Sequence, residues 1–508
     1  MPKSSKSVLF ATISLFLVIT VVDSAAPRVH AQVAGSAGTK STEVYRVMIE
    51  AFKSSVMEDN LRKLTDEIGG RIPGTVAMVQ AIRWAQSAFR EAGGENIHTE
   101  SFQIPHSWEE GRTSFFIESP VQFEVRGISV AWAPALAPAL EHARIVDIGE
   151  GTFKQFRLAG DISHCIVLIH TRVLKTWDDL FEEYTSVPPI VDKAVKGGAA
   201  AIVFIGAREH ELLYRHTNTQ NGRIDRIPQL IVAREDGLRI ARLLAQGRKV
   251  YGRLLVPNKI GEAFQTSNVI AEIRGSENPK EFVVLGAHLD SWELGTGALD
   301  NGCNAALVVD VLRAIHAAGL RPRRTIRFVL FSGEEEGLLG SQAYMRQHHN
   351  ELNDAVAAVI FDSGSGRVTG FTLSGRKDLA TLVRDIIAPL KSLGVTEVTQ
   401  DADIGTDNFD FVLQGVPTLE ANQDPANYME NYHAMSDTFD KVDMTQMRKS
   451  VAAAAAVVLS VANGTQRLGG RQNRAEIEHL LQETHLDQQM KIFGIWGEWE
   501  SGKRGRTP

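Results

Sequence analysis

Cysteine is scarce in this chain, since Cys165 and Cys303 are the only two among 508 residues. Two thiols so far apart in the sequence exclude a disulfide framework, and isolated buried thiols are the expected alternative. Positive charge is also in deficit, because 54 lysines and arginines stand against 61 acidic residues. The resulting net charge of −7 gives no electrostatic reason to expect a nucleic acid partner.

The N-terminal region also lacks an apolar run of the length that a membrane-spanning helix needs. The uncharged run at residues 8–22 follows two lysines and is short for a membrane span. Small residues precede Gln32, so we expect residues 1–31 to be a signal peptide that is cleaved near Ala31. Ala26 is the second choice for the cleavage position, and an uncleaved anchor is the alternative. The mature protein would then be periplasmic or extracellular, without a stable membrane span after cleavage.

The length favours two domains over a single core. Short strands dominate residues 121–260, and this block interrupts an α/β pattern that occupies residues 32–120 and resumes at residues 261–465. We therefore expect one larger α/β domain in two segments with a smaller inserted α/β domain between them. Residues 466–508 are expected to hold a C-terminal helix, and the last residues are expected to be disordered.

One stretch organises the larger domain. Residues 283–287 and 325–331 are short apolar runs rich in β-branched residues, typical of buried strands, and residues 304–317 are apolar at helical spacing. A strand–helix–strand unit of this length favours parallel strands joined by a right-handed crossover. We expect a mixed, mostly parallel central sheet flanked by helices, and ligands in such sheets bind beyond the carboxyl ends of the strands.

Ionisable residues gather where these strands end. They are His288, Asp290, Asp300, Glu334, Glu335 and Asp362. Any one of these acids taken alone is best explained as a solvated loop residue, but five carboxylates at one sheet edge would repel one another and resist ionisation. A pair of divalent cations removes that conflict, and histidine with carboxylate ligands suits Zn²⁺, with Mn²⁺ or Co²⁺ as substitutes.

The same residues carry a resemblance to a known family. The motifs are Gly286–Trp292, Gly297–Gly302, Gly333–Gly337 and Gly405–Asp407. In this order they resemble the co-catalytic di-zinc exopeptidases of the aminopeptidase type, and they are most similar to the plasma glutamate carboxypeptidase (carboxypeptidase Q) branch. The block at residues 121–260 resembles the protease-associated domain that this branch carries as an insertion. The resemblance implies the zinc exopeptidase fold.

The resemblance also implies a set of metal ligands. His288 and Asp362 would bind one zinc ion, Glu335 and His433 would bind the other, and Asp300 would bridge both. Two zinc ions per chain are then expected, each with an open position for chemistry.

Three further roles follow from the resemblance. Asp290 would orient His288, Glu334 would be the general base, and Tyr432 would donate its hydroxyl to the developing oxyanion. Three consecutive glutamates leave the register open, so Glu334 could instead be a second ligand; Gly337 favours the first register.

These observations favour a secreted zinc exopeptidase that hydrolyses peptides or dipeptides. A glutaminyl-cyclase-like enzyme with one zinc ion and a non-catalytic, receptor-like scaffold are the alternatives. The complete ligand set argues against both, and metal stoichiometry separates them. A homodimer, supported by the inserted domain, remains open at this stage.

Overall fold

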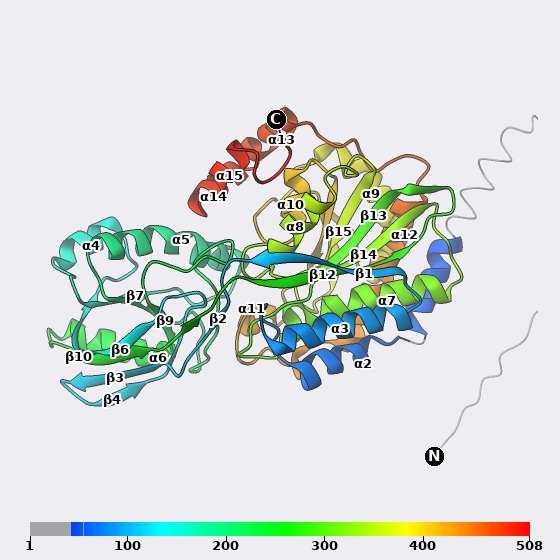
Figure 1. Cartoon of the computed structure of the whole chain (residues 1–508). Helices are drawn as coiled ribbons and strands as arrows, with labels where there is room; N and C mark the ends of the chain where they lie inside the picture. The colour runs from blue at the N-terminus through cyan, green and yellow to red at the C-terminus, as the bar shows by residue number, and fades with distance from the viewer. Residues whose placement is uncertain (1–41, 54, 508) are drawn as a thin grey trace, which may run out of the picture. The chain divides into compact units, whose positions relative to one another are not determined.

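Two eight-stranded sheets organise the computed structural model (Figure 1). The structure describes residues 42–53 and 55–507, and from Glu43 onward these form one compact unit. The signal peptide predicted for residues 1–31 lies outside the described residues. Both cysteines are buried free thiols, as predicted.

The first sheet is mixed, and the predicted fold class is confirmed. In spatial order its strands are β1 (Glu95–Ile104), β12 (Phe264–Ile273), β14 (Arg324–Phe331), β13 (Asn278–His288), β15 (Ala355–Ile360), β18 (Thr418–Gln423), β16 (Val368–Thr372) and β17 (Glu397–Thr399). The central strands β14, β13, β15 and β18 run parallel to one another, whereas β12 pairs antiparallel with β1 and β14. β16 pairs antiparallel with β18 and parallel with β17. The carboxyl ends of the parallel strands therefore meet at one edge.

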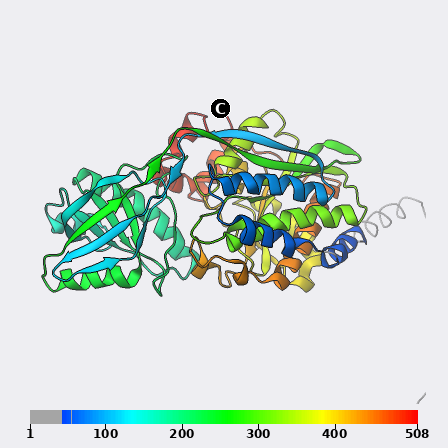
Figure 2. The same ribbon diagram turned by 60° about the horizontal axis from the view of Figure 1, so that its bottom comes forward.

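Helices cover both faces of this sheet. One face carries α2 (Met57–Arg62), α3 (Val76–Glu91), α7 (Cys303–Ala317) and α12 (Met444–Asn463), and the other carries α8 (Leu339–Gln347) and α10 (Asn408–Leu413). Figure 2 shows α2 and α3 in blue beside the green α7. Almost every residue of α7 is buried, including Asp310 and Arg313, which pair with each other. The helix α9 (Ala380–Ile387) is flanked on each side by a 3₁₀ turn.

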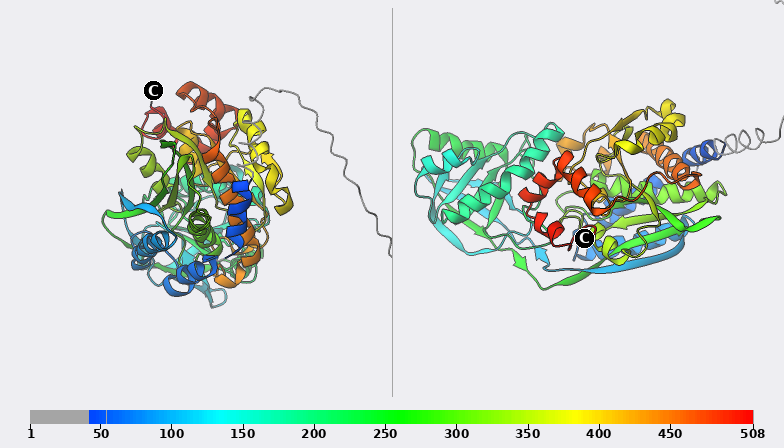
Figure 3. Two further views of the ribbon diagram at one scale, coloured as in Figure 1. Left: turned by 90° about the vertical axis from the view of Figure 1, so that its right-hand side faces the viewer. Right: turned by 90° about the horizontal axis from the view of Figure 1, so that it is seen from above.

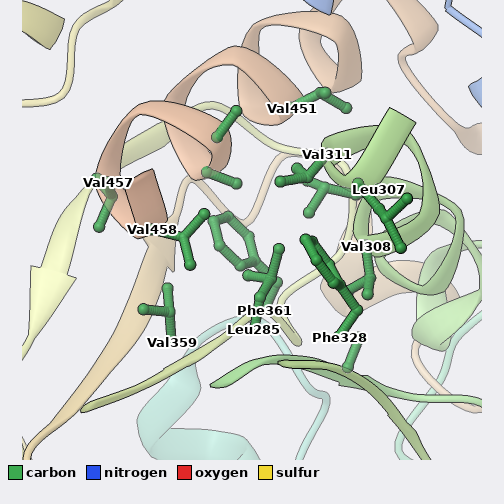
Figure 4. Packing of buried hydrophobic residues seen from close by; sticks show 14 of the residues in the cluster. Leu285, Leu307, Val308, Val311, Phe328, Val359, Phe361, Val451, Val457 and Val458 are labelled. Atoms are coloured by element: carbon green, nitrogen blue, oxygen red, sulfur yellow. The ribbon is translucent and has the colours of Figure 1, made fainter. Parts of the chain in front are cut away.

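The main core lies between the sheet and the pair α7 and α12 (Figure 4). Leu285 and Phe328 of the strands meet Leu307 of α7, while Val451 and Val458 approach from α12, and all five side chains are buried. Burying each such side chain contributes roughly 1.5–3 kcal/mol. The strand ends that carry the ionisable residues thus project from a rigidly packed core.

The second sheet belongs to a module inserted between β1 and β12. Its strands, in spatial order, are β4 (Phe123–Val125), β3 (Ser114–Ser119), β10 (Tyr251–Val256), β6 (Leu136–Asp147), β7 (Ile166–His170), β8 (Ala201–Ile205), β9 (Gln229–Val232) and β5 (Gly127–Ser129). We call residues 114–256 the inserted module. It begins ahead of the expected residue 121, because β3 pairs with β10 and β4.

The helices of the inserted module are α4 (Phe153–Ala159), α5 (Trp177–Lys196) and α6 (Arg234–Ala245). The helix α5 has a polar start, which a capping box formed by Thr176 and Asp179 fixes, and it continues through Pro188 and Pro189. The short strands β2 (Trp108–Glu109) and β11 (Lys259–Ile260) pair where the chain enters and leaves the module.

The C-terminal segment is ordered as far as Thr507, so the expectation of a disordered end is wrong for the described residues. It forms α13 (Arg474–Glu483), α14 (Leu486–Ile492) and α15 (Trp496–Glu500). Figure 3 shows these helices in red beside α5 of the inserted module. Arg504 is buried and donates two hydrogen bonds to Asp410 of α10. Within residues 42–53 and 55–507, no helix combines the length and apolar character that crossing a membrane requires.

Candidate metal centre

The parallel strands bring the predicted residues to one sheet edge. β13 ends at His288, which lies opposite Phe331, the last residue of β14. Glu334 and Glu335 follow β14 within four residues, and Asp362 follows β15 within two. The aligned register explains why side chains from three separate parts of the chain converge.

His288 lies at the centre of a first group. Its Nε2 is 2.9 Å from Asp362 Oδ1 and 3.2 Å from Asp300 Oδ1. Its Nδ1 lies 3.0 Å from the backbone carbonyl oxygen of Asp290, whereas the nearer carboxylate oxygen of Asp290 is 3.8 Å away. The ring is thus oriented through a carbonyl rather than the expected carboxylate, which instead accepts a hydrogen bond from the backbone N–H of Glu335 at 3.2 Å.

His433 lies at the centre of a second group. Its Nε2 is 3.0 Å from Glu335 Oε2 and 3.2 Å from Asp300 Oδ2. Each group offers three ligand atoms within 4.8 Å of one another, so each is compact enough to hold a metal ion. Asp300 belongs to both groups and presents one carboxylate oxygen to each histidine, which is the arrangement that a bridging ligand requires.

The electrostatics of these residues demand positive charge. Burial lowers the pKa of His433, but Glu335 and Asp300 outweigh it and raise the pKa to about 9. Burial likewise opposes protonation of His288, and Asp362 and Asp300 raise its pKa well above the usual value. Burial raises the pKa of Glu335 to about 7. Without metal ions, the histidines would take up protons to balance the carboxylates.

The residues present fit a pair of metal ions. Glu335 Oε1 is buried and lacks a hydrogen-bond partner among the described residues, and the buried Asp300 Oδ2 lies 3.2 Å from His433 Nε2 without a well-oriented hydrogen bond. Leaving such atoms unpaired is costly, and a cation satisfies them. The donor set is nitrogen and carboxylate oxygen without sulfur, which suits zinc.

Two residues that the sequence did not single out as functional hold the loop that carries Asp300. Asp437 accepts hydrogen bonds from the backbone N–H groups of Ala298, Leu299 and Asp300. Arg71 is fully buried, and its guanidinium donates to four carbonyl oxygens, those of Gly69, Leu289, Thr296 and Gly297. Burial lowers the pKa of this guanidinium to about 10. Arg71 lies in a glycine-rich turn. Its charge inside that turn was the one feature of the sequence that could have indicated a special role for it.

Glu334 lies beside both groups without belonging to either. Its side chain is half-buried, and burial, together with Asp362 and Glu335, raises its pKa well above the usual value. The following Glu336 is buried with one carboxylate oxygen unpaired, and its backbone carbonyl accepts from Gly222 of the inserted module. Among the three glutamates, Glu335 is therefore the one within reach of His433.

Tyrosine side chains line the second group. The ring of Tyr432 stacks on that of His433 with centroids 3.7 Å apart, and its hydroxyl lies 3.0 Å from the hydroxyl of Tyr184. The hydroxyl expected to face an oxyanion is thus engaged with the inserted module. Tyr428, which the sequence did not suggest, places its hydroxyl 3.4 Å from the carbonyl oxygen of Asp362.

A groove of about 320 Å³ adjoins this region. It is lined by α5, by residues 217–226 of the inserted module and by residues 492–495 of the C-terminal segment, and Tyr184 is part of its wall. Asp407, in a loop at the same edge, is fully buried, and neither of its carboxylate oxygens has a hydrogen-bond partner among the described residues. The surroundings of the two groups are therefore shaped by three separate parts of the chain.

Comparisons with known proteins agree with this geometry. Residues 268–458 match the model of peptidase family M28. Carboxypeptidase Q of Rattus norvegicus is 29% identical over 416 residues, covering 81% of this chain and 86% of the relative. The crystal structure of a peptidase M28 precursor from Shewanella amazonensis SB2B is 26% identical, with a TM-score of 0.77, and the match covers 86% of this chain and 99% of that chain.

A more distant structure shares the fold. BSAP, a zinc aminopeptidase from Bacillus subtilis, is 18% identical with a TM-score of 0.63, and the match covers 83% of this chain and 98% of that chain. The similarity extends over both sheets, since it includes far more than the residues that the family model matches.

Proposed function

We propose that this chain is a zinc exopeptidase with two metal ions that hydrolyses small peptides. The match of residues 268–458 to the model of peptidase family M28 and the similarity to carboxypeptidase Q support this proposal. The observation that carries the proposal is the position of Asp300, whose two carboxylate oxygens lie 3.2 Å from the Nε2 atoms of His288 and His433. A carboxylate placed in this way can bind two adjacent cations at once, one through each oxygen.

In this proposal each group holds one ion. His288 and Asp362 hold the first, Glu335 and His433 hold the second, and Asp300 bridges them. When bound, the pair of ions supplies Lewis-acid chemistry, which activates a water molecule for attack and polarises the peptide carbonyl.

Glu334 does the proton transfer. Its carboxylate lies next to both groups, in a half-buried position where nearby acids raise its pKa, so it binds a proton readily. It accepts the proton of the attacking water at its carboxylate oxygen and delivers that proton to the amine of the leaving group. A raised pKa suits a group that must act first as a base and then as an acid.

The substrate class follows from the names of the relatives. Carboxypeptidase Q and the zinc aminopeptidase BSAP both act at chain ends by name, so we propose an exopeptidase or dipeptidase. The proposal includes export, because residues 1–31 have the pattern of a signal peptide. The inserted module is proposed to be a protease-associated domain.

A panel of dipeptides, blocked at the amino end, at the carboxyl end or at neither, tests the proposal on purified full-length protein. We expect hydrolysis of unblocked peptides, loss of activity with a chelator, and recovery with zinc. Elemental analysis should give two metal ions per chain. Metal-replete protein that cleaves no peptide would overturn the proposal, and one ion per chain would favour the glutaminyl-cyclase-like alternative.

A further inference from the structure

The loop that carries His433 is held by the inserted module through its backbone. The N–H of Arg215 donates to the carbonyl oxygen of His433 at 3.0 Å, and the N–H of Met435 donates to the carbonyl oxygen of Leu213 at 3.0 Å. Tyr214 and Ala434 form an isolated antiparallel bridge between these bonds. An isolated β-bridge with two backbone hydrogen bonds thus joins the loop to a segment of the module.

A second connection runs through side chains. Tyr184 projects from α5, and its hydroxyl lies 3.0 Å from the hydroxyl of Tyr432 and 3.4 Å from Nδ1 of His433. Among the described residues, this hydroxyl is the hydrogen-bond partner of His433 Nδ1. Arg208 of the module also donates to the carbonyl oxygen of Tyr432 at 3.1 Å, which fixes the residue that stacks on the histidine.

We propose that Tyr184 is a positioning residue for His433, through which the inserted module completes the second metal-binding group. The proposal rests on the proposed function in that the centre holds metal ions. Nε2 of His433 faces Asp300 and Glu335, so a metal bound there leaves the ring proton on Nδ1. That proton needs an acceptor, and a fixed acceptor sets both the tautomer and the plane of the ring.

The hydroxyl of Tyr184 can accept from Nδ1–H and donate its own proton to the hydroxyl oxygen of Tyr432. Burial raises the pKa of Tyr184 well above its usual value, so the hydroxyl keeps that proton. The ring of Tyr184 is held by His216, whose own ring lies with its centroid 5.5 Å away. Burial lowers the pKa of His216 to about 4, so this neighbour adds no charge at neutral pH.

In the first group, the ring nitrogen Nδ1 of His288 has a different hydrogen-bond partner. Nδ1 of His288 faces the backbone carbonyl oxygen of Asp290, two residues along the same chain segment. The inserted module takes no part in that contact. The two groups therefore predict an asymmetry: removing the Tyr184 hydroxyl should weaken the metal ion at His433 and spare the one at His288.

Chelator competition on full-length Tyr184→Phe protein tests this asymmetry. We expect one of the two zinc ions to bind about 10–100-fold more weakly than in the unsubstituted protein, as is typical when such a partner is lost, and the other to be unchanged. Tyr432→Phe leaves the Tyr184 oxygen in place and should cause a smaller loss. Tyr344→Phe is the matched control, because Tyr344 is a buried tyrosine whose hydroxyl accepts from Arg327, away from both groups; both affinities should be unchanged.

Thermal unfolding of the metal-free proteins separates positioning from general damage. Tyr184→Phe and unsubstituted protein should unfold at similar temperatures without metal. Unchanged affinity for both ions would overturn the proposal, and so would equal weakening of both ions with a lower unfolding temperature. If the unsubstituted protein binds two ions but cleaves no peptide, the proposed function fails, while the ratio of affinities still decides the role of Tyr184.

Discussion

The carboxylate of Asp437 accepts a hydrogen bond from the backbone N–H of Asp300 at 3.1 Å. The same carboxylate accepts from the two preceding N–H groups, so one side chain holds the whole turn that presents Asp300. Burial raises the pKa of Asp437 to about 7, because the buried site disfavours the charged carboxylate. The position of the shared ligand therefore depends on a residue from a distant part of the chain.

Replacing Asp437 should weaken metal binding in both groups. Asp437→Ala leaves three N–H groups without their acceptor and frees the turn, so we expect roughly 10–100-fold weaker binding of both ions in chelator competition. Asp300→Ala should lose at least one metal equivalent, because it removes the bridge itself. Asp440→Ala is the control, since Asp440 is an exposed acid three residues along that pairs with Lys441. Two tightly bound ions in Asp300→Ala would contradict the bridging role.

Replacing Glu334 should separate catalysis from metal binding. Glu334→Gln keeps the shape of the side chain but cannot accept a proton, so turnover should fall by on the order of 10²–10⁴-fold while both metal ions remain. The measurements are kcat with a dipeptide and elemental analysis of the same sample. Glu336→Gln tests the register and should keep most of the activity. If Glu336→Gln is inactive and Glu334→Gln is not, the assignment of the base is wrong.

A cluster away from the metal centre should make stability depend on pH. Glu100 of β1 accepts from His348 at 2.8 Å and from His98 at 3.2 Å. Burial raises the pKa of Glu100, but these bonds outweigh burial and lower the pKa to about 2, from the ordinary 4.5. The hydrogen bond to Glu100 in turn raises the pKa of His98 above 6.5.

The directions of the two pKa shifts define the pH range in which this cluster stabilises the protein. The lowered pKa of Glu100 gives stability that is present above pH 4.5 and is lost as the pH falls toward 2. The raised pKa of His98 gives stability that is present below pH 6.5 and is lost at higher pH. The difference in unfolding free energy between unsubstituted and Glu100→Gln protein should therefore be largest near pH 5.5, on the order of 1 kcal/mol. Urea unfolding at about pH 3.5, 5.5 and 8 checks this, and a difference that does not change with pH would contradict it.

Replacing Arg504 should destabilise the protein although it lies four residues from the C-terminus. Asp410 accepts from Arg504 at 2.8 and 2.9 Å in a buried pair. Arg504→Met leaves that carboxylate buried without its cation, which should cost about 3–5 kcal/mol. Lys503→Met, next in the chain and exposed, is the control and should unfold at the temperature of the unsubstituted protein. Combining Arg504→Met with Asp410→Leu should recover part of the loss in a thermal unfolding measurement, because no unpaired charge remains.

The pattern of apolar residues was sufficient to predict those strands and helices that consist of one apolar run. The strands at residues 283–287 and 325–331 and the helix at residues 304–317 appear within a few residues of their predicted ends, because their apolar periodicity is not contested by other interactions. Pattern was insufficient for α5, whose polar start depends on a capping box, and for the C-terminal residues, whose order depends on Asp410.

The sequence by itself determined which acids and histidines follow which strands, and from this it predicts cations at the sheet edge. Only the tertiary structure decided how they are held. Asp437, Arg71 and Tyr184 each act through a hydrogen bond to a residue more than a hundred positions away. Such contacts leave no periodicity in the sequence, because the geometry of a hydrogen bond is set by folding and not by spacing along the chain.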